Sequence, residues 1–351
     1  MRKVVHVVGT GTIGEPLIGL LVDHREAFGI DEVTFHKRTP TLEERAKIAD
    51  LVRRGAVLAV EDDRREAFEA LGLTPTLGGA EALAQATVVI DSTPAGNKNK
   101  EQSYAALDGP LGFLAQGSEC GFGKMYARGI NDEALARGED RFLHVVSCNT
   151  HNISVLVKTV AFDGGTSHLV DGRFVCMRRA NDISQDGSFA PSPTVGRHDN
   201  PRFGTHHARD AHGVFATLGL DLALWSSAIV LNTQYMHVLH FSLTLDHDVT
   251  AEEVVTRLGT NSRVALTRKR SANQVFSFGR DHGYFGRILS QTVVPTQTIG
   301  VRDRRTVVGF CFTPQDGNAL LSSVAATLWY LYPEGFEERI DVLRPYLFRE
   351  V

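Results

Sequence analysis

The chain has 351 residues, of which 42% are hydrophobic and 22% are charged, and its formal net charge is −4. This is the composition of a globular protein, and the length favours two domains over one. A slightly acidic chain, with an isoelectric point of about 6.4, does not favour a nucleic acid or an anionic membrane as partner. No apolar run approaches the ~20 residues of a membrane span, so we predict a cytoplasmic protein with no membrane and no nucleic-acid partner.

The cysteines do not form a recognisable framework. No C-x-x-C pair occurs, which argues against both disulfides and a zinc site. The segment 202–212 contains three histidines, but no carboxylate or cysteine completes a ligand set convincingly, so we predict no metal. A thiol therefore remains free to act as a nucleophile. The cysteines are Cys120, Cys148, Cys176 and Cys311.

The N-terminus carries a glycine-rich turn between a strand and a helix. The apolar run Val4–Val8 leads into Gly-Thr-Gly-Thr-Ile-Gly, and a helical pattern follows over 15–23. In a dinucleotide-binding turn the first glycine turns tightly, the second admits the pyrophosphate and the third lets the helix pack on the strand. The helix N-terminus then offers N–H groups to the phosphates. The alternative is a glycine turn without a ligand. The predicted cofactor contacts are Gly9, Thr10, Gly11, Thr12, Ile13 and Gly14.

Strands and helices alternate through the rest of the first half. This alternation predicts a parallel, doubly wound sheet. The predicted strands cover 32–36, 57–60, 87–90 and 142–146, and a predicted helix covers 42–54.

The end of the second strand indicates which cofactor is bound. Asp31 and Glu32 open this strand, whereas its end carries Lys37 and Arg38 beside Thr39. Two cations and a hydroxyl suit the 2′-phosphate of NADP better than the free ribose of NAD. We predict NADP, with NAD also accommodated; the alternative is a solvated basic turn. Further cofactor contacts are predicted where the strand 87–90 ends, at Thr93 and Pro94.

Cys148 follows the predicted strand 142–146 and precedes a helical pattern over 153–160. This position at a helix N-terminus predicts a lowered thiol pKa and a reactive thiolate. The alternative is a buried structural cysteine.

At this point the sequence resembles the archaeal-type (type II) glyceraldehyde-3-phosphate dehydrogenase family, as a divergent, bacterial member. The matching motifs occur in the family's order and span residues 1 to about 250. Besides the glycine turn, they are Val145-Val146-Ser147-Cys148-Asn149-Thr150, Met177-Arg178-Arg179-Ala180, Thr205-His206-His207 and Tyr235-Met236-His237.

The resemblance implies a role for each motif. Cys148 is the expected nucleophile and His237, on a predicted strand, the expected general base. Arg178 and Arg179 face opposite sides of a strand, so one reaches an anionic substrate and the other forms a structural ion pair; which does which stays open. The resemblance implies substrate contacts from Ser147, Asn149, Thr150, Arg178, Arg179, His206 and His207, the histidines lying in a loop.

The resemblance also implies a reaction. An aldehyde adds to the thiol, hydride passes to NAD(P), and orthophosphate or water releases the thioester. The first hypothesis is phosphorylating oxidation of glyceraldehyde 3-phosphate. A second is the same chemistry on another phosphorylated or phosphonate aldehyde, because His151-Asn152, Leu239 and the segments 116–123 and 181–202 depart from the family pattern. A third is a non-catalytic dinucleotide-binding regulator.

The predicted fold class is α/β, with a Rossmann domain built on a doubly wound parallel sheet and an α+β substrate domain built on a mixed or antiparallel sheet. The Rossmann domain is expected over 1–147, completed by a C-terminal helix at about 318–351, and the catalytic domain over 148–317. Its strands are predicted at 174–177, 228–231, 236–245 and 306–311. The resemblance implies a homotetramer.

Overall fold

The computed structural model describes residues 2–182, 190–314 and 316–351, and the chain divides into two compact units. The first unit contains Met1–Lys124, Ala136–Val145 and Ser322–Val342; the second contains Met125–Leu135, Val146–Leu321 and Leu343–Val351. The division into two compact units does not test the predicted domain limits at residues 147 and 318, which remain a prediction. Residues 183–189 of the divergent segment 181–202 lie outside the described residues.

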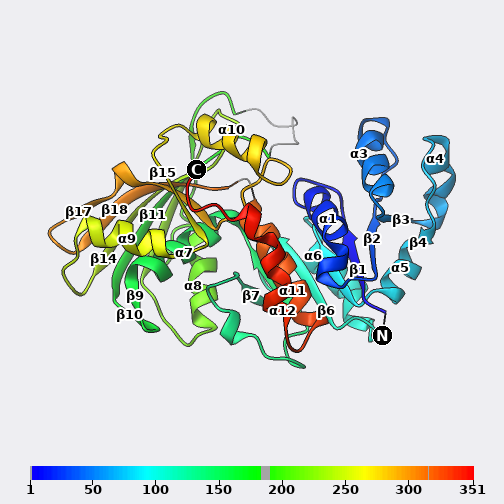
Figure 1. Ribbon diagram of the computed structural model, residues 1–351, viewed down its shortest axis with the longest axis horizontal. Coiled ribbons are helices and arrows are strands. Elements are labelled where there is room, and N and C mark those ends of the chain that lie inside the picture. Colours follow the sequence, from blue (N-terminus) through cyan, green and yellow to red (C-terminus); the bar gives the residue numbers. More distant parts are fainter. Residues whose placement is uncertain (1, 183–189, 315) are drawn as a thin grey trace. The chain divides into compact units, whose positions relative to one another are not determined.

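An eight-stranded sheet organises the N-terminal part of the chain, drawn blue to cyan in Figure 1. β1 pairs in parallel with β2 on one side and with β5 on the other. The strand order therefore reverses at β1, which is the switch point of a doubly wound fold and confirms that prediction. In sheet order the strands are β4 (Leu77–Gly78), β3 (Val57–Val60), β2 (Glu32–His36), β1 (Val4–Val8), β5 (Val88–Asp91), β6 (Gly112–Gly117), β8 (Phe142–Val146) and β7 (Lys124–Tyr126).

The central strands of this sheet are continuous apolar runs because parallel strands are covered on both faces. Val7 of β1 lies opposite Phe35 of β2 and Ile90 of β5, and all three side chains are fully buried. Such runs carry a strong local signal, and the predicted strands 4–8, 32–36 and 57–60 agree with the structure residue for residue. The helices and 3-10 turns around this sheet are α1 (Gly14–Asp23), α2 (Arg25–Phe28), α3 (Leu42–Arg53), η1 (Asp62–Arg64), α4 (Arg65–Ala70), α5 (Gly79–Gln85), α6 (Gly96–Gln102), η2 (Tyr104–Ala106) and α12 (Phe336–Ile340).

The second unit contains a mixed sheet. Its strand β11 pairs in parallel with β13 and antiparallel with β14, which confirms the predicted α+β class. In sheet order the strands are β12 (Thr194–Val195), β13 (Leu224–Val230), β11 (Leu169–Arg178), β14 (Val238–Leu245), β18 (Thr306–Phe312), β16 (Thr292–Pro295) and β15 (Val264–Thr267), with β17 (Gly300–Arg302) on β18 and a hairpin of β9 (Phe162–Asp163) and β10 (Thr166–Ser167).

One face of this sheet is covered by helices. Along β14 the buried Leu239, Phe241 and Leu243 alternate with half-buried residues, so every second side chain enters the core. This core includes apolar side chains of α7, α8 and α9, which Figure 1 shows on one side of the sheet. The helices and 3-10 turns of the second unit are η3 (Asp132–Ala134), α7 (Cys148–Ala161), α8 (His206–Ala216), α9 (Ala251–Thr260), α10 (Ala272–His282) and η4 (Thr296–Thr298). The residues of α11 (Gly317–Leu331) and η5 (Asp341–Tyr346) are divided between the two units.

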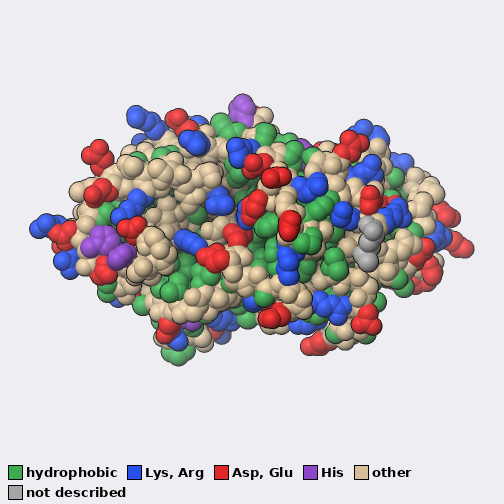
Figure 2. All heavy atoms as spheres, turned by 60° about the horizontal axis from the view of Figure 1, so that its bottom comes forward, with side chains coloured by type: hydrophobic (Ala, Val, Ile, Leu, Met, Phe, Trp, Pro, Cys, Tyr) green, Lys and Arg blue, Asp and Glu red, His purple; other side chains and the backbone are tan. Residues whose placement is uncertain are grey.

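Two surface properties bear on partners. None of the helices that the structure describes is long and apolar enough to cross a membrane. On the face shown in Figure 2, lysine and arginine side chains are interspersed with aspartate and glutamate.

Candidate active site

The glycine turn between β1 and α1 has the geometry that its sequence predicts. Gly9 has φ +94°, a conformation that favours glycine, and a Cβ on Gly14 would lie 2.2 Å from the Gly9 carbonyl oxygen. A Cβ on Gly11 would meet nothing within 4 Å. Ile13, the N-cap residue of α1, makes no side-chain capping bond. The turn therefore combines free space with helix N–H groups that no capping side chain occupies, which is what a phosphate needs.

A cavity of about 830 Å³ lies beside this turn, entirely within the first unit. Residues after β1, β2 and β5 line it, at the carboxyl ends where doubly wound sheets bind their ligands. Of the predicted cofactor residues, Gly9, Thr10, Lys37, Arg38, Thr93 and Pro94 line the cavity; Gly11, Thr12, Ile13 and Gly14 belong to the turn but not to the lining.

The two cations of the basic turn after β2 differ in whether a carboxylate of the protein already neutralises them. Lys37 Nζ lies 3.1 Å from a carboxylate oxygen of Glu44, and Lys47 Nζ lies 2.5 Å from the same oxygen and donates to the Thr10 carbonyl at 3.0 Å. Arg38 is exposed and forms no ion pair with the residues that the structure describes. Arg38 is therefore the cation most available to an added phosphate. Sequence reasoning missed Lys47, which sits on α3 without a local motif.

Asp91, the last residue of β5, organises the other wall of the cavity and was also missed. Its Oδ1 accepts hydrogen bonds from the Thr93 hydroxyl and backbone N–H, at 2.6 and 2.9 Å. Its Oδ2 accepts from Asn99 Nδ2 and from the Tyr104 hydroxyl, both at 2.7 Å. Asp91 is fully buried, so these donors satisfy its charge and fix the predicted Thr93-Pro94 turn.

In the second unit Cys148 is the first residue of α7, at the predicted helix N-terminus. Ser147 is the N-cap, and its Oγ accepts from the Thr150 backbone N–H at 3.4 Å. Cys148 as a whole residue is half-buried. Burial of the sulfur and the nearby Asp316 carboxylate raise the pKa of Cys148, against the lowering effect of Arg179 and Arg178. The prediction that the helix N-terminus lowers the pKa of Cys148 is therefore wrong, because the effect of burial outweighs that of the helix dipole.

His237 lies one residue before β14 rather than on it, which corrects the predicted strand 236–245. Its Nδ1 accepts a hydrogen bond from the Arg179 backbone N–H at 2.9 Å. Burial and the Arg179 charge lower the pKa of His237 to about 3. The imidazole is thus neutral, and with Nδ1 occupied as an acceptor its proton is on Nε2.

The two adjacent arginines behave differently, as predicted for alternate faces. Arg179 is buried, and its Nη2 lies 3.1 Å from Asp316 and 3.0 Å from Asp182. Asp316 has φ +65° and was not predicted as a site residue. Arg178, at the end of β11, is exposed and forms no ion pair within the described part of the chain. Arg179 is therefore the structural member, and Arg178 is the one available to an anion.

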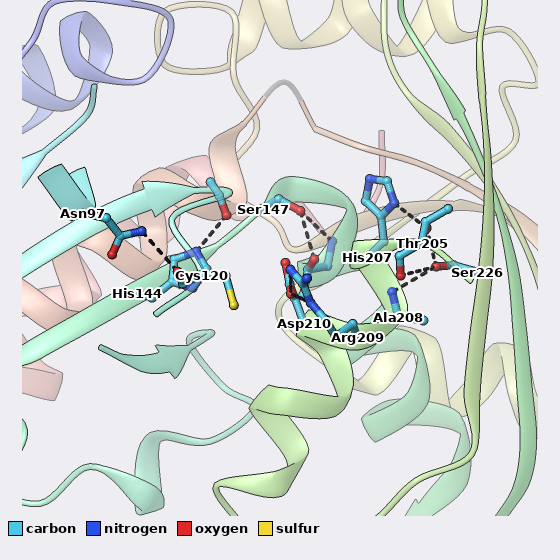
Figure 3. A network of polar contacts seen from close by, with 12 residues as sticks. Asn97, Cys120, His144, Ser147, Thr205, His207, Ala208, Arg209, Asp210 and Ser226 are labelled. Atoms are coloured by element: carbon cyan, nitrogen blue, oxygen red, sulfur yellow. Dashed lines mark hydrogen bonds and ion pairs between the residues drawn. The ribbon is translucent and has the colours of Figure 1, made fainter. Parts of the chain in front are cut away.

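His206 and His207 are the first two residues of α8, not part of a loop as predicted. Their ring centroids lie 3.9 Å apart, with the ring planes tilted by 32°. Figure 3 shows the polar network that holds this turn: Thr205 Oγ1 lies 3.0 Å from His207 Nδ1 and 2.6 Å from Ser226 Oγ, which accepts from the Ala208 N–H at 3.0 Å. Ser226 was not predicted.

Several of the predicted residues of the second unit act on one another electrostatically. The charge of Arg178 acts on Cys148, His206, His207 and His237, and the charges of Arg179 and Asp316 act on both Cys148 and His237. A thiol, a neutral imidazole with Nε2–H and an available guanidinium therefore lie within electrostatic range, with the Arg178 charge acting on both other groups. This set can add a nucleophile to a carbonyl, donate to the resulting oxyanion and hold an anionic substituent.

Away from the candidate site, the described residues include one group of potential metal ligands, which consists of His168, Asp246 and His247. Asp246 accepts from Nδ1 of His168 at 3.1 Å and of His247 at 2.9 Å. These hydrogen bonds account for the arrangement of the group.

The fold defines an α/β protein with a Rossmann-like doubly wound sheet and a second domain on a mixed sheet, which carries Cys148 and His237. No protein-family model matches the chain. The chain is nevertheless similar over most of its length to archaeal glyceraldehyde-3-phosphate dehydrogenases, the family that its motifs resemble. It is 27% identical to that of Pyrobaculum neutrophilum (80% of this chain, 78% of the relative), 26% to that of Metallosphaera sedula (85% and 84%) and 28% to glyceraldehyde-3-phosphate dehydrogenase 2 of Methanosarcina barkeri (86% and 84%).

Proposed function

We propose that the chain is an NAD(P)-dependent dehydrogenase that oxidises glyceraldehyde 3-phosphate through a thioester on Cys148 and releases the acyl group to orthophosphate. The proposal is supported chiefly by Cys148 at the start of α7, the neutral His237, and the available Arg178, whose charge acts on both of them. The names of the relatives support the same substrate.

The first steps follow from the side chains. The Cys148 thiol gives its proton to solvent water, and the thiolate attacks the aldehyde carbon, so a C–S bond forms and the carbonyl oxygen gains the electron pair of the C=O π bond. His237 Nε2–H donates a hydrogen bond to this oxygen. The predicted general-base role requires the other tautomer, in which the Arg179 N–H loses its acceptor. Arg178, with His206 and His207, binds the phosphate group.

A nicotinamide dinucleotide supplies one function when bound: it accepts the hydride that leaves the substrate carbon. This departure restores the C=O bond and leaves a thioester on Cys148. An orthophosphate oxygen then attacks the thioester carbon, the C–S bond breaks, and the thiolate leaves as the acyl phosphate forms. Asn149 and Thr150 line this turn with polar groups, as the family resemblance implies.

The first unit fits such a cofactor. The open space over Gly11 and the helix N–H groups that no side chain caps suit its diphosphate. Lys37, Arg38 and Thr39 line the cavity at the end of β2, where the ribose binds in this fold. Because Arg38 forms no ion pair with any described residue, we propose NADP as the preferred cofactor and NAD as the weaker one.

We assign cofactor binding to the Rossmann domain and chemistry to the mixed-sheet domain, and expect a cytoplasmic homotetramer. Val175 and Phe310 are each 38% exposed on the mixed sheet, a surface that further subunits would cover.

The test is reduction of NADP and of NAD by the purified protein with glyceraldehyde 3-phosphate, with and without orthophosphate. Phosphate-dependent reduction, faster with NADP, is the expected result. Phosphate-independent reduction would instead indicate hydrolysis of the thioester. The absence of reduction, with cofactor binding intact, would overturn the proposed substrate.

A second candidate is the same chemistry on a different phosphorylated or phosphonate aldehyde. His151 and Asn152, which depart from the family pattern, are both fully buried in the first turns of α7. A panel of such aldehydes with matched chain lengths separates the two candidates by their kcat/KM values. If no aldehyde reacts and Cys148 resists alkylation, the results would favour the third hypothesis, a non-catalytic dinucleotide-binding regulator.

A further inference from the structure

Thr313 directly follows β18 and joins two parts of the candidate site. Its side chain is buried, with 2% of the residue exposed. Its backbone N–H donates to the carbonyl oxygen of His237 at 3.0 Å. Its hydroxyl donates to Asn149 Oδ1 at 3.3 Å and accepts a hydrogen bond from Asn152 Nδ2. One residue therefore contacts both the backbone of His237 and the first turn of the helix that begins with Cys148.

The direction of these hydrogen bonds is determined by chemistry. An amide Nδ2 is only a donor, so Asn152 occupies an acceptor site of the Thr313 oxygen and the hydroxyl proton is left for Asn149 Oδ1. The bonds therefore run in one direction, from Asn152 through Thr313 to Asn149, an arrangement in which each bond strengthens the next. Asn149 is held by its oxygen, which leaves its Nδ2 as the donor that remains for a substrate oxygen.

A second contact holds the same turn. Asn318 Nδ2 donates to the Cys148 carbonyl at 3.1 Å and to the Gln291 carbonyl at 3.0 Å, and Asn318 is fully buried. With Asn318 fixing the Cys148 backbone, the hydroxyl of Thr313 has a narrower task, which is to orient the Asn149 carboxamide. Asn152, one of the departures from the family pattern, has a use in this chain as the donor that orients that hydroxyl.

We infer that Thr313 is a positioning residue: its hydroxyl, oriented by Asn152, holds the Asn149 carboxamide toward the reacting oxygen, and its N–H holds the backbone of His237 in register with the Cys148 turn. The inference rests on the proposed function. Thr313 acts through its neighbours and does not touch the substrate.

The test compares Thr313→Val, which keeps the shape and the N–H but lacks the hydroxyl, with Thr313→Ser, which restores it. The matched control is Thr159→Val, because the Thr159 hydroxyl also accepts from an asparagine amide, that of Asn261 at 2.8 Å, at the far end of α7. The readouts are kcat and KM with glyceraldehyde 3-phosphate, the rate of Cys148 alkylation by iodoacetamide, and the thermal midpoint.

For Thr313→Val we expect kcat to fall about 10- to 100-fold, the scale of a small misplacement of catalytic groups, with KM changed less than about threefold. Alkylation of Cys148 should become several-fold faster because the first turn is held less tightly. Thr313→Ser and Thr159→Val should stay near the wild type in both respects. Equal kcat and alkylation rates for Thr313→Val and wild type, or an equal loss in Thr313→Ser, would overturn the inference.

Two further points keep the test decisive. If Thr313→Val does not fold, Asn152→Leu is the substitute variant. It removes the donor that begins the series of hydrogen bonds from Asn152 through Thr313 to Asn149, and it should also lower kcat with KM nearly unchanged. If the wild type oxidises no aldehyde, the proposed function fails, yet the alkylation rates of the Val and Ser variants still decide the positioning role.

Discussion

Two of the turns that lead from a strand into a helix N-terminus, those from β1 to α1 and from β8 to α7, differ in how the first N–H groups are satisfied. At the turn from β1 to α1, the N-cap Ile13 has no side chain that caps the helix. At the turn from β8 to α7, Ser147 caps the helix through the Thr150 N–H and also hydrogen-bonds the Thr150 hydroxyl at 2.9 Å.

The difference shows that the same local motif serves two kinds of chemistry. The uncapped turn leaves donors and space for a ligand phosphate. The capped turn uses a donor internally, so its function depends on the side chain of Cys148 and on the charges around it. The first turn can be interpreted from its own residues. The second depends on residues far away in sequence, among them Arg179, His237 and Asp316.

The largest effect is expected from the substitution that removes the reactive thiol of the capped turn. Cys148→Ala should lower turnover by about 10⁴-fold or more, because the variant lacks the thiol that is proposed to form the thioester. Binding of NADP, measured by quenching of protein fluorescence, should be unchanged. Cys120→Ala is the control, since that exposed cysteine lies outside α7. Turnover retained in Cys148→Ala would show that the capped turn is not the reaction centre.

The second prediction separates Arg178 from Arg179. Arg179→Met leaves the buried Asp316 without its partner and should reduce the free energy of unfolding by about 3–5 kcal/mol, as expected for a broken buried pair. Arg178→Met should change it by less than about 0.5 kcal/mol but raise KM for the phosphorylated aldehyde. Urea denaturation and initial rates measure the two effects. Similar losses of stability in both variants would contradict the division of roles.

Local signals predicted much of the fold. The strands of the Rossmann sheet were predictable because buried parallel strands are short apolar runs between turns. The helix position of Cys148 was predictable for a similar reason, since the strand before it and the apolar helix after it bracket the cysteine. The glycine turn was the clearest case, because each glycine has a distinct steric requirement.

The rest depends on tertiary contacts that no short segment encodes. The start of α8 was missed because His206 and His207 open the helix and Thr205 supplies no side-chain capping bond. Asp316 meets Arg179 across 137 positions, and Thr313 meets Asn152 across 161. The thiol pKa was mispredicted for the same reason: the helix dipole is local, whereas the burial that outweighs it is not.

The third prediction concerns acid stability, and both units contribute to it. Burial lowers the pKa of His6 in β1 to about 3, as it does for His237. Both imidazoles are neutral when folded and bind protons below pH 6.5 when unfolded, so their stabilisation is complete above about pH 6.5 and is lost as the pH falls toward 3. Each should contribute a slope of about 1.4 kcal/mol per pH unit in this range.

Urea midpoints from pH 7.5 to 4.5 measure this slope. His6→Asn should reduce the slope of the unfolding free energy against pH by the contribution of one histidine. The substitution Arg64→Ala, at an exposed residue, should leave this slope unchanged. An unchanged slope in His6→Asn would mean that this histidine is not held neutral in the folded state.

The smallest expected effect concerns the cofactor side of the comparison. Arg38→Ala should weaken NADP binding about tenfold, the value of one charge-assisted hydrogen bond of ~1.5 kcal/mol, and should leave NAD binding nearly unchanged. The reason is that Lys37 already shares Glu44 with Lys47, so Arg38 is the cation free to meet the 2′-phosphate. Titration of both cofactors into wild type, Arg38→Ala and Arg64→Ala measures the effect. Equal weakening of NADP and NAD would assign Arg38 to the common part of the dinucleotide, and the preference for NADP would then have to come from Lys37.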